Sequence, residues 1–126
     1  MARRCATDAD ENTAFLLGAA LGELALAGKD KPTLIAAPAI AGFGGWLEQL
    51  IAESLGKKGK GIIPIDGEVP GAPEVYGDDR VFIHLRSTAS PDIAADQAAQ
   101  RLERAGHPVI HIDWPDRYAL GAEFYR

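Results

Sequence analysis

The chain has 126 residues, of which 47% are hydrophobic, so it can bury one sizeable core and is too short to build two. Acidic residues outnumber basic ones by 18 to 13, and the resulting net charge of -5 argues against a nucleic-acid binder. No apolar run approaches the roughly 20 residues that cross a bilayer, which argues against a membrane protein. We therefore expect one soluble domain.

Residues 1–11 form a polar leader that is basic at its start and acidic toward its end. The leader lacks the apolar segment of a signal peptide, so secretion is not expected. The single cysteine, Cys5, lies in this leader and cannot form an intramolecular disulfide, which fits a reducing compartment. We expect a flexible leader over residues 1–11, one domain over residues 12–126, and a cytoplasmic location.

The first predicted element is a helix from Asn12 to Gly28, because the apolar residues between them broadly follow helical spacing. Asn12 or Thr13 suits the N-cap position, and Gly28 suits the end of the helix. Residues 33–37 form a short apolar run with almost no polar alternation, which predicts a strand buried on both faces. Such strands are typical of parallel sheets.

A second amphipathic helix is predicted over residues 43–55, where a glycine-rich segment opens it and Gly56 closes it. Residues 61–65 predict another buried strand, in which Pro64 indicates that the strand ends early or pairs incompletely. Residues 66–77 are rich in glycine and proline, which predicts a long loop and a good place for a site.

The rest of the chain predicts a strand at residues 81–85, a helix over residues 92–105 and a strand at residues 108–112. Strands that alternate with long helices require right-handed crossovers and a parallel sheet with helices on both faces. The sequence therefore predicts an α/β fold, a doubly wound three-layer α/β/α sandwich with a parallel sheet.

Glu53 interrupts the apolar stripe of the second predicted helix, on the same side as Trp46. A half-buried position beside Trp46 and Leu50 would disfavour the charged form of the carboxyl group and suit it to proton transfer near neutral pH. The alternative is an ordinary ion pair with Lys57, four residues further on, along a solvated flank of the helix. From the spacing alone, the ion pair is the commoner arrangement.

Other polar groups predict structural roles. Residues 56–61 are rich in glycine and lysine and could cradle a phosphate, but they do not link a strand to a helix as a P-loop does, so a solvated basic turn is favoured. His84 and His111 fall within predicted strands and His107 in a turn, and their spacing indicates neither a metal cluster nor a triad. Residues 78–80, Asp-Asp-Arg, predict a structural ion pair at a strand entrance.

Residues 46–57 read Trp-Leu-Glu-Gln-Leu-Ile-Ala-Glu-Ser-Leu-Gly-Lys, which resembles the Glu-Ser-X-Gly-Lys signature of glucose-6-phosphate isomerases. The similarity continues through Gly59-Lys60-Gly61-Ile62-Ile63-Pro64. The chain is most similar to the divergent isomerase half of bifunctional transaldolase and glucose-6-phosphate isomerase proteins, through residues 28–31, 75–80 and 120–124. The resemblance covers nearly the whole chain from Asn12 onward.

This family builds its site from two sugar-isomerase (SIS) subdomains, and the chain resembles the second. The resemblance implies that Glu53 is the general base, which carries a proton between C1 and C2 through a cis-enediolate and converts glucose 6-phosphate to fructose 6-phosphate. Gln49 and Lys57 are weaker candidates for substrate-binding groups. No cofactor and no metal is expected. Because ligands of open α/β sheets bind at the carboxyl ends of the strands, we expect Glu53 to open onto that pocket.

Three features depart from the family pattern. The Ser/Thr-rich phosphate loop belongs to the first SIS subdomain, and nothing here matches it. Residues 67–70, Gly-Glu-Val-Pro, resemble a Gly-Glu-Pro motif, but no histidine follows them through Arg80, so ring opening has no assigned residue. Relatives continue past the position of Arg126, so we expect a subdomain that is incomplete at its C-terminus.

We therefore expect part of a phosphosugar isomerase whose isolated chain is inactive. Its expected partners are a sugar phosphate, a first SIS subdomain and a transaldolase domain, with a homodimer left open and neither nucleic acid nor membrane involved. The alternative is a noncatalytic SIS module that binds a sugar phosphate for regulation or assembly. Glu53 favours the enzyme, and the missing phosphate loop favours the module. A third possibility is an association surface for the rest of a polypeptide.

Overall fold

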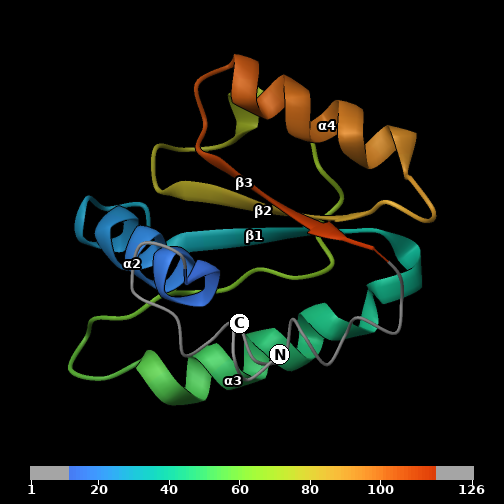
Figure 1. Ribbon diagram of the computed structural model, residues 1–126. Helices are drawn as coiled ribbons and strands as arrows, with labels where there is room; N and C mark the ends of the chain where they lie inside the picture. Colours follow the sequence, from blue (N-terminus) through green and yellow to red (C-terminus); the bar gives the residue numbers. More distant parts are fainter. Residues whose placement is uncertain (1–11, 116–126) are drawn as a thin grey trace.

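The computed structural model describes residues 12–115 (Figure 1). Its helices and strands follow one another in this order: α2 (Thr13–Leu26), β1 (Lys31–Ala36), the short 3-10 helix η1 (Pro38–Ile40), α3 (Gly42–Leu55), the 3-10 helix η2 (Pro73–Val75), β2 (Arg80–Ser87), α4 (Ile93–Arg104) and β3 (Val109–Trp114). The expected leader, Cys5 and the family-like segment 120–124 lie outside the described residues. All three predicted long helices are confirmed.

The sheet has three strands in the order β1-β2-β3, and both pairings are parallel. The central strand, β2, places His84 opposite Ile35 on one side and opposite His111 on the other. Burial of nearly all of β1 and β2 agrees with strands covered on both faces. The chain therefore has the predicted α/β fold with a parallel sheet.

The strand predicted at residues 61–65 is not formed, although the incomplete pairing expected there is observed. This segment runs beside β1 but makes a single parallel bridge, between Thr33 and Ile65. The amide of Ile65 donates to the carbonyl of Pro32 at 2.8 Å, and the amide of Leu34 donates to the carbonyl of Ile65 at 2.9 Å. The next donor in this ladder would be residue 32, which is a proline and has no N–H. Pro32 therefore shortens the pairing, whereas the missing N–H of Pro64 faces away from β1.

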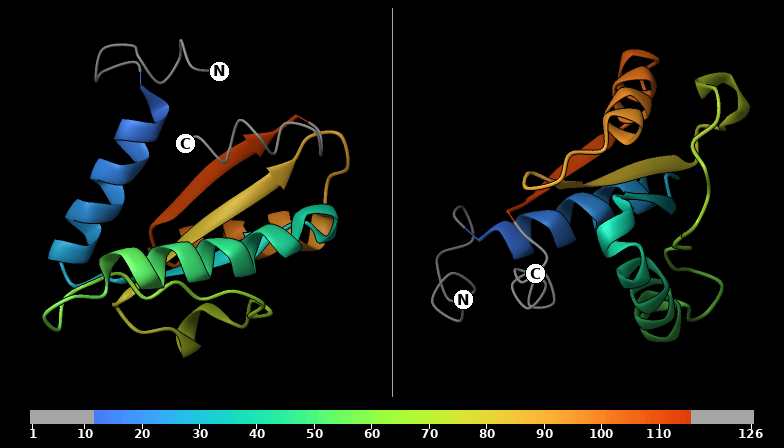
Figure 2. Two further views of the ribbon diagram at one scale, coloured as in Figure 1. Left: turned by 90° about the horizontal axis from the view of Figure 1, so that it is seen from below. Right: turned by 90° about the vertical axis from the view of Figure 1, so that its right-hand side faces the viewer.

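Helices cover both faces of the sheet, as Figure 2 shows: α4 lies on one face, and α2 and α3 lie on the other. Successive strand residues point to opposite faces, so adjacent residues of one strand enter different clusters. On the α4 face the buried cluster is Ile35, Phe82, Ala99 and Leu102. On the other face it is Leu34, Ala37, Ile40, Ile83, Leu85, Ile112 and Trp114. The molecule is a three-layer α/β/α sandwich.

Local signals define the ends of α2. The side-chain oxygen of Asn12 accepts hydrogen bonds from the amides of Ala14 and Phe15, both at 3.1 Å, so Asn12 is the N-cap. Gly28 has a φ of 87°, which a glycine adopts without strain, and the next amide bonds back to the carbonyl of Leu24 at 2.8 Å. Both predicted ends are confirmed.

Candidate functional site

Glu53 lies in the last turn of α3 and is exposed, so the expected half-burial is wrong. The helix packs on the sheet through Phe43 and Leu47 instead. Trp46 stacks on Phe43, with ring centroids 5.5 Å apart. Two helical turns separate Trp46 from Glu53 by about 10 Å, so a shared side of the helix does not place the indole over the carboxylate.

Gln49 contacts Glu53 directly. Its side-chain Nε2 donates to Glu53 Oε1 at 3.3 Å, across one turn of the exposed helix surface. Among the ion pairs within residues 12–115, none joins Glu53 to Lys57, so the alternative reading of that spacing is not observed. The structure therefore brings two of the three predicted site residues together.

Lys57 begins a tight turn just after α3. Its amide and carbonyl exchange hydrogen bonds with Lys60, both at 3.1 Å. Lys58 and Gly59 have positive φ values of 57° and 71°, as a turn of this kind requires. All four residues are exposed, which confirms the solvated basic turn. Lys57 and Lys60 also line an open hollow of about 700 Å³ against α2, where Gly18 and Gly22 face it.

Glu53 and Lys57 lie at the opposite end of the sheet from the pocket that we expected Glu53 to enter. The helix α3 starts after the carboxyl end of β1 and runs back, and Ile63 then bonds to Asp30 at the start of β1. The end of α3 therefore lies near the amino ends of the strands. The expectation that Glu53 opens at the carboxyl ends is wrong, because Glu53 sits on the returning end of the crossover helix.

A cavity of about 440 Å³ does occupy the carboxyl end of β1. It lies between α4 and residues 66–70, which belong to the predicted long loop of residues 66–77. Its lining includes apolar groups of β1 and α4 and four charged side chains: Asp66, Glu68, Asp92 and Arg101. Sequence reasoning singled out neither Asp66 nor Arg101.

Asp66 packs tightly against the start of α3. A Cβ added to the buried Gly44 would collide with the carboxylate of Asp66, whereas one added to Gly45 would stay 3.9 Å from its Oδ2 atom. Glycine at position 44 therefore makes room for Asp66. The glycine-rich segment at the start of α3 was the signal in the sequence, but its partner lies 22 residues further along and has no motif of its own.

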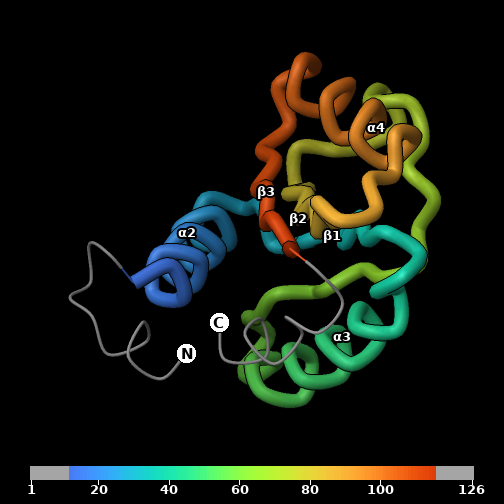
Figure 3. The backbone as a smooth tube through the Cα atoms, turned by 45° about the vertical axis from the view of Figure 1, so that its right-hand side comes forward, coloured from blue at the N-terminus to red at the C-terminus, as the bar shows by residue number. Residues whose placement is uncertain are grey.

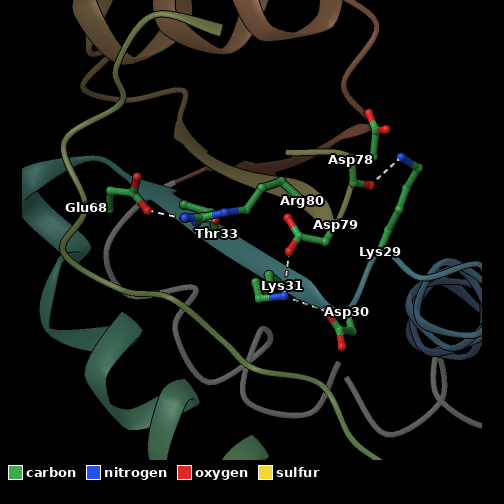
Figure 4. A network of polar contacts seen from close by, with 8 residues as sticks. All are labelled: Lys29, Asp30, Lys31, Thr33, Glu68, Asp78, Asp79 and Arg80. Atoms are coloured by element: carbon green, nitrogen blue, oxygen red, sulfur yellow. Dashed lines mark hydrogen bonds and ion pairs between the residues drawn. The ribbon is translucent and has the colours of Figure 1, made fainter. Parts of the chain in front are cut away.

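Ion pairs fix the loop that forms one wall of the cavity (Figure 4). Arg80 Nη1 donates to Glu68 Oε2 at 2.9 Å and to Thr33 Oγ1 at 2.7 Å. Lys31 Nζ bonds to Asp79 Oδ2 at 2.6 Å, and this hydrogen bond raises the pKa of Lys31 and lowers the pKa of Asp79. The structural role predicted for residues 78–80 is confirmed. Glu68 of the Gly-Glu-Val-Pro segment takes part in this scaffold.

His84 and His111 meet under α4, which their spacing did not predict. Their Nδ1 atoms are 3.2 Å apart, and His84 Nε2 lies 3.4 Å from Asp96 Oδ1. His84 is only 2% exposed, and burial lowers its pKa, while the nearby Asp96 opposes that shift. Within residues 12–115 no group of three or more histidine, cysteine or acidic side chains could hold a metal ion.

Comparisons with known proteins define the fold and leave the family open. No protein-family model matches the chain, and no curated protein matches it in sequence. The crystal structure of hypothetical protein TT0462 from Thermus thermophilus is similar, with a TM-score of 0.78 at 15% sequence identity. The match covers 98% of this chain and 39% of that chain, so this chain spans about two fifths of its structural neighbour. The class that fold and comparison establish is an α/β domain with a parallel sheet.

None of the helices in the described part of the chain is both long enough and apolar enough to span a membrane.

Proposed function

We propose that the chain is the second SIS subdomain of a phosphosugar aldose-ketose isomerase, and that Glu53 is its general base. The observation that carries the proposal is the placement of Glu53 in the Glu-Ser-Leu-Gly-Lys segment: its carboxylate is exposed at the end of α3 and accepts a hydrogen bond from Gln49. An exposed carboxylate is open to a substrate held from outside. Burial is not needed for this role, provided that a partner domain closes over the site.

The reaction would need one base that serves two neighbouring carbons. With the open-chain aldose phosphate bound, Glu53 takes the proton from C2, and the electrons of that C–H bond form the C1–C2 double bond of a cis-enediolate. The proton then returns to C1 while the hydroxyl proton moves from O2 to O1, which yields the ketose phosphate. Gln49 holds one oxygen of Glu53 and so orients the other toward the substrate. Lys57 would attract the anionic substrate. No cofactor enters this sequence.

Two functional groups of such an isomerase have no match in this sequence, as expected if the chain is one subdomain of the enzyme. The phosphate loop and the ring-opening group would come from a first SIS subdomain, in the same polypeptide or as a partner, with a transaldolase domain also attached. The chain spans 39% of its structural neighbour, which leaves room for such parts. Because orientation of a bound substrate can contribute roughly 7 to 11 kcal/mol to lowering the barrier, we expect no measurable isomerisation by the isolated chain. The proposed compartment is the cytoplasm.

The test is Glu53→Gln in the assembly that contains both SIS subdomains. Glutamine keeps the shape and loses proton acceptance, so kcat should fall by about 10²- to 10⁴-fold with little change in the affinity for glucose 6-phosphate. Glu48→Gln is the matched control, because Glu48 is exposed on the same helix and should leave kcat unchanged. Equal kcat for Glu53→Gln and Glu48→Gln would contradict the assignment.

The rival function is a noncatalytic SIS module that binds a sugar phosphate. It predicts an assembly that binds glucose 6-phosphate and never produces fructose 6-phosphate. In that case the wild-type assembly and Glu53→Gln would give the same zero rate, which separates the rival from a misassigned base.

A further inference from the structure

The cavity at the carboxyl end of β1 has no part in the proposed reaction, because Glu53 lies at the other end of α3. We propose that this cavity binds a small anionic polyol, with the anion at Arg101 and hydroxyl groups at Asp66. The inference does not depend on the chemistry assigned to Glu53.

The position of the cavity in the sheet favours ligand binding. The segment 61–65 lies beside β1 on one side and β2 lies on the other, and the chain leaves β1 toward one face and β2 toward the opposite face. The loops therefore diverge above the carboxyl ends of β1 and β2. Open α/β sheets bind their ligands in the crevice at such a switch point. The volume of about 440 Å³ suits a ligand of monosaccharide size.

The charged groups that line the cavity differ in whether they already have hydrogen-bond partners. Glu68 is already bound to Arg80, and Asp92 caps α4 by accepting from the amides of Ala94 and Ala95 at 3.0 and 3.1 Å. Asp66 and Arg101, by contrast, have no hydrogen-bond or ion-pair partner for their side chains within residues 12–115. They are the two charged lining groups with capacity left for a ligand.

The chemistry of these groups selects the ligand class. A guanidinium binds a phosphate or carboxylate through two parallel N–H donors, and this pairing is stronger than a neutral hydrogen bond. An ionised carboxylate only accepts, so Asp66 requires donors such as hydroxyl groups. Ile35, Ala95 and Ala98 supply an apolar surface, which suits the C–H face of a sugar or sugar alcohol. An anion without hydroxyl groups would bind only Arg101, and a polyol without charge would bind only Asp66.

The room for Asp66 is built into the helix beside it. A Cβ at Gly44 would displace its carboxylate, so the sequence keeps that carboxylate at the cavity wall through a glycine in the first turn of α3. The ion pair between Arg80 and Glu68 fixes the loop that carries Asp66. The wall is therefore held in place before any ligand arrives.

The experiment is an NMR titration of the 126-residue chain with glucose 6-phosphate as the probe. Amide shifts should map to residues 66–70 and to α4, and glucose or inorganic phosphate alone should bind at least about tenfold more weakly. Arg101→Gln should weaken binding by at least about tenfold, and Asp66→Asn by about three- to tenfold. Arg104→Gln is the matched control on the same helix, because Arg104 does not line the cavity.

Two results would overturn the inference. One is the absence of shifts at about 10 mM probe, which would fill about nine-tenths of a site with a Kd of about 1 mM. The other is binding that survives Arg101→Gln but is lost in Lys57→Gln, with shifts confined to residues 49–60, which would assign the ligand to the Glu53 surface. If Asp66→Asn perturbs folding, Arg101→Gln decides the outcome alone, because Arg101 is exposed and its substitution should not affect folding. Cavity binding is measured by shifts at residues 66–70 and α4, and catalysis by turnover of the assembly, so failure of one is distinguishable from failure of the other.

Discussion

The helices on the two faces of the sheet are buried to very different degrees. On one face, α4 buries Ala98, Ala99 and Leu102 and is capped by Asp92. On the other face, α2 has no buried residue, and the only buried residue of α3 is Gly44. Figure 3 shows α2 and α3 spread apart across this second face.

Exposed apolar residues follow the same division. Phe15, Leu16 and Leu26 of α2 are 57%, 48% and 80% exposed, and Leu50 and Leu55 of α3 are 46% and 48% exposed. The part of an apolar side chain that stays in contact with water does not stabilise the fold, and a surface that gathers such side chains is typical of an interaction site. Glu53 and Lys57 belong to this open side. The helix α4 is therefore packed more completely onto the sheet than α2 or α3.

The largest expected effect is on the α4 face. Leu102 is 0% exposed, so Leu102→Ala should lower the free energy of unfolding by about 2–5 kcal/mol, through lost burial and the cavity that remains. Leu26→Ala, on the open face at 80% exposure, should change it by less than about 0.5 kcal/mol. Urea unfolding of both variants measures the contrast. Similar losses would contradict the difference in packing between α4 and α2.

Gly44, in the first turn of α3, should also be sensitive to substitution. Gly44→Ala places a Cβ against Asp66 and should cost about 1–3 kcal/mol of unfolding free energy. Gly45→Ala meets little and should instead gain up to about 1 kcal/mol from the better helix propensity of alanine. Thermal unfolding compares the two. The cost of Gly44→Ala should shrink in an Asp66→Gly background, and an unchanged cost there would rule out the collision.

The histidine pair predicts a smaller, pH-dependent contribution from the α4 face. Burial lowers the pKa of His84 in the folded state, so the unfolded state binds the proton more readily as pH falls. This contribution is fully present above the ordinary value of 6.5 and is lost as pH falls from there toward the folded pKa, with a slope of at most about 1.4 kcal/mol per pH unit. The charged groups around the ring are Asp96, His111, Arg86 and Asp113.

Urea unfolding between about pH 5 and pH 8, the range in which histidine titrates, tests this contribution. The free energy of unfolding should rise with pH in the wild type and rise less steeply in His84→Gln, with Glu48→Gln on α3 as a control that leaves both histidines and their charged neighbours in place. Identical pH profiles for the wild type and His84→Gln would show that the buried ring does not couple protons to folding.

Local signals in the sequence were enough to predict most of the fold. Helical periodicity and the caps Asn12 and Gly28 are properties of single segments, so α2, α3 and α4 were predicted close to their observed bounds. Incomplete pairing of residues 61–65 was predicted from Pro64, but its cause was missed because Pro32 lies in another segment. The exposure of Glu53 was missed because helical spacing gives a direction around the axis but ignores the distance along it.

The candidate sites show the same limit. A motif located Glu53, Gln49 and Lys57, since they lie within one short segment. The contact between His84 and His111 depends on the register of β2 against β3, which no single segment encodes. The packing of Asp66 on Gly44 depends on how a loop returns to the start of a helix. These contacts arise only when the chain folds.

The most direct measurement of the central claim is hydrogen exchange between the substrate and the solvent. In D₂O, the proposed assembly of both SIS subdomains should place deuterium from the solvent at C1 of fructose 6-phosphate, because the proposed base, Glu53, would hold the transferred proton long enough for some of it to exchange. Glu53→Gln should reduce this incorporation by about 10²- to 10⁴-fold, while Glu48→Gln should leave it unchanged. Undiminished incorporation in Glu53→Gln would contradict the assignment of Glu53 as the base.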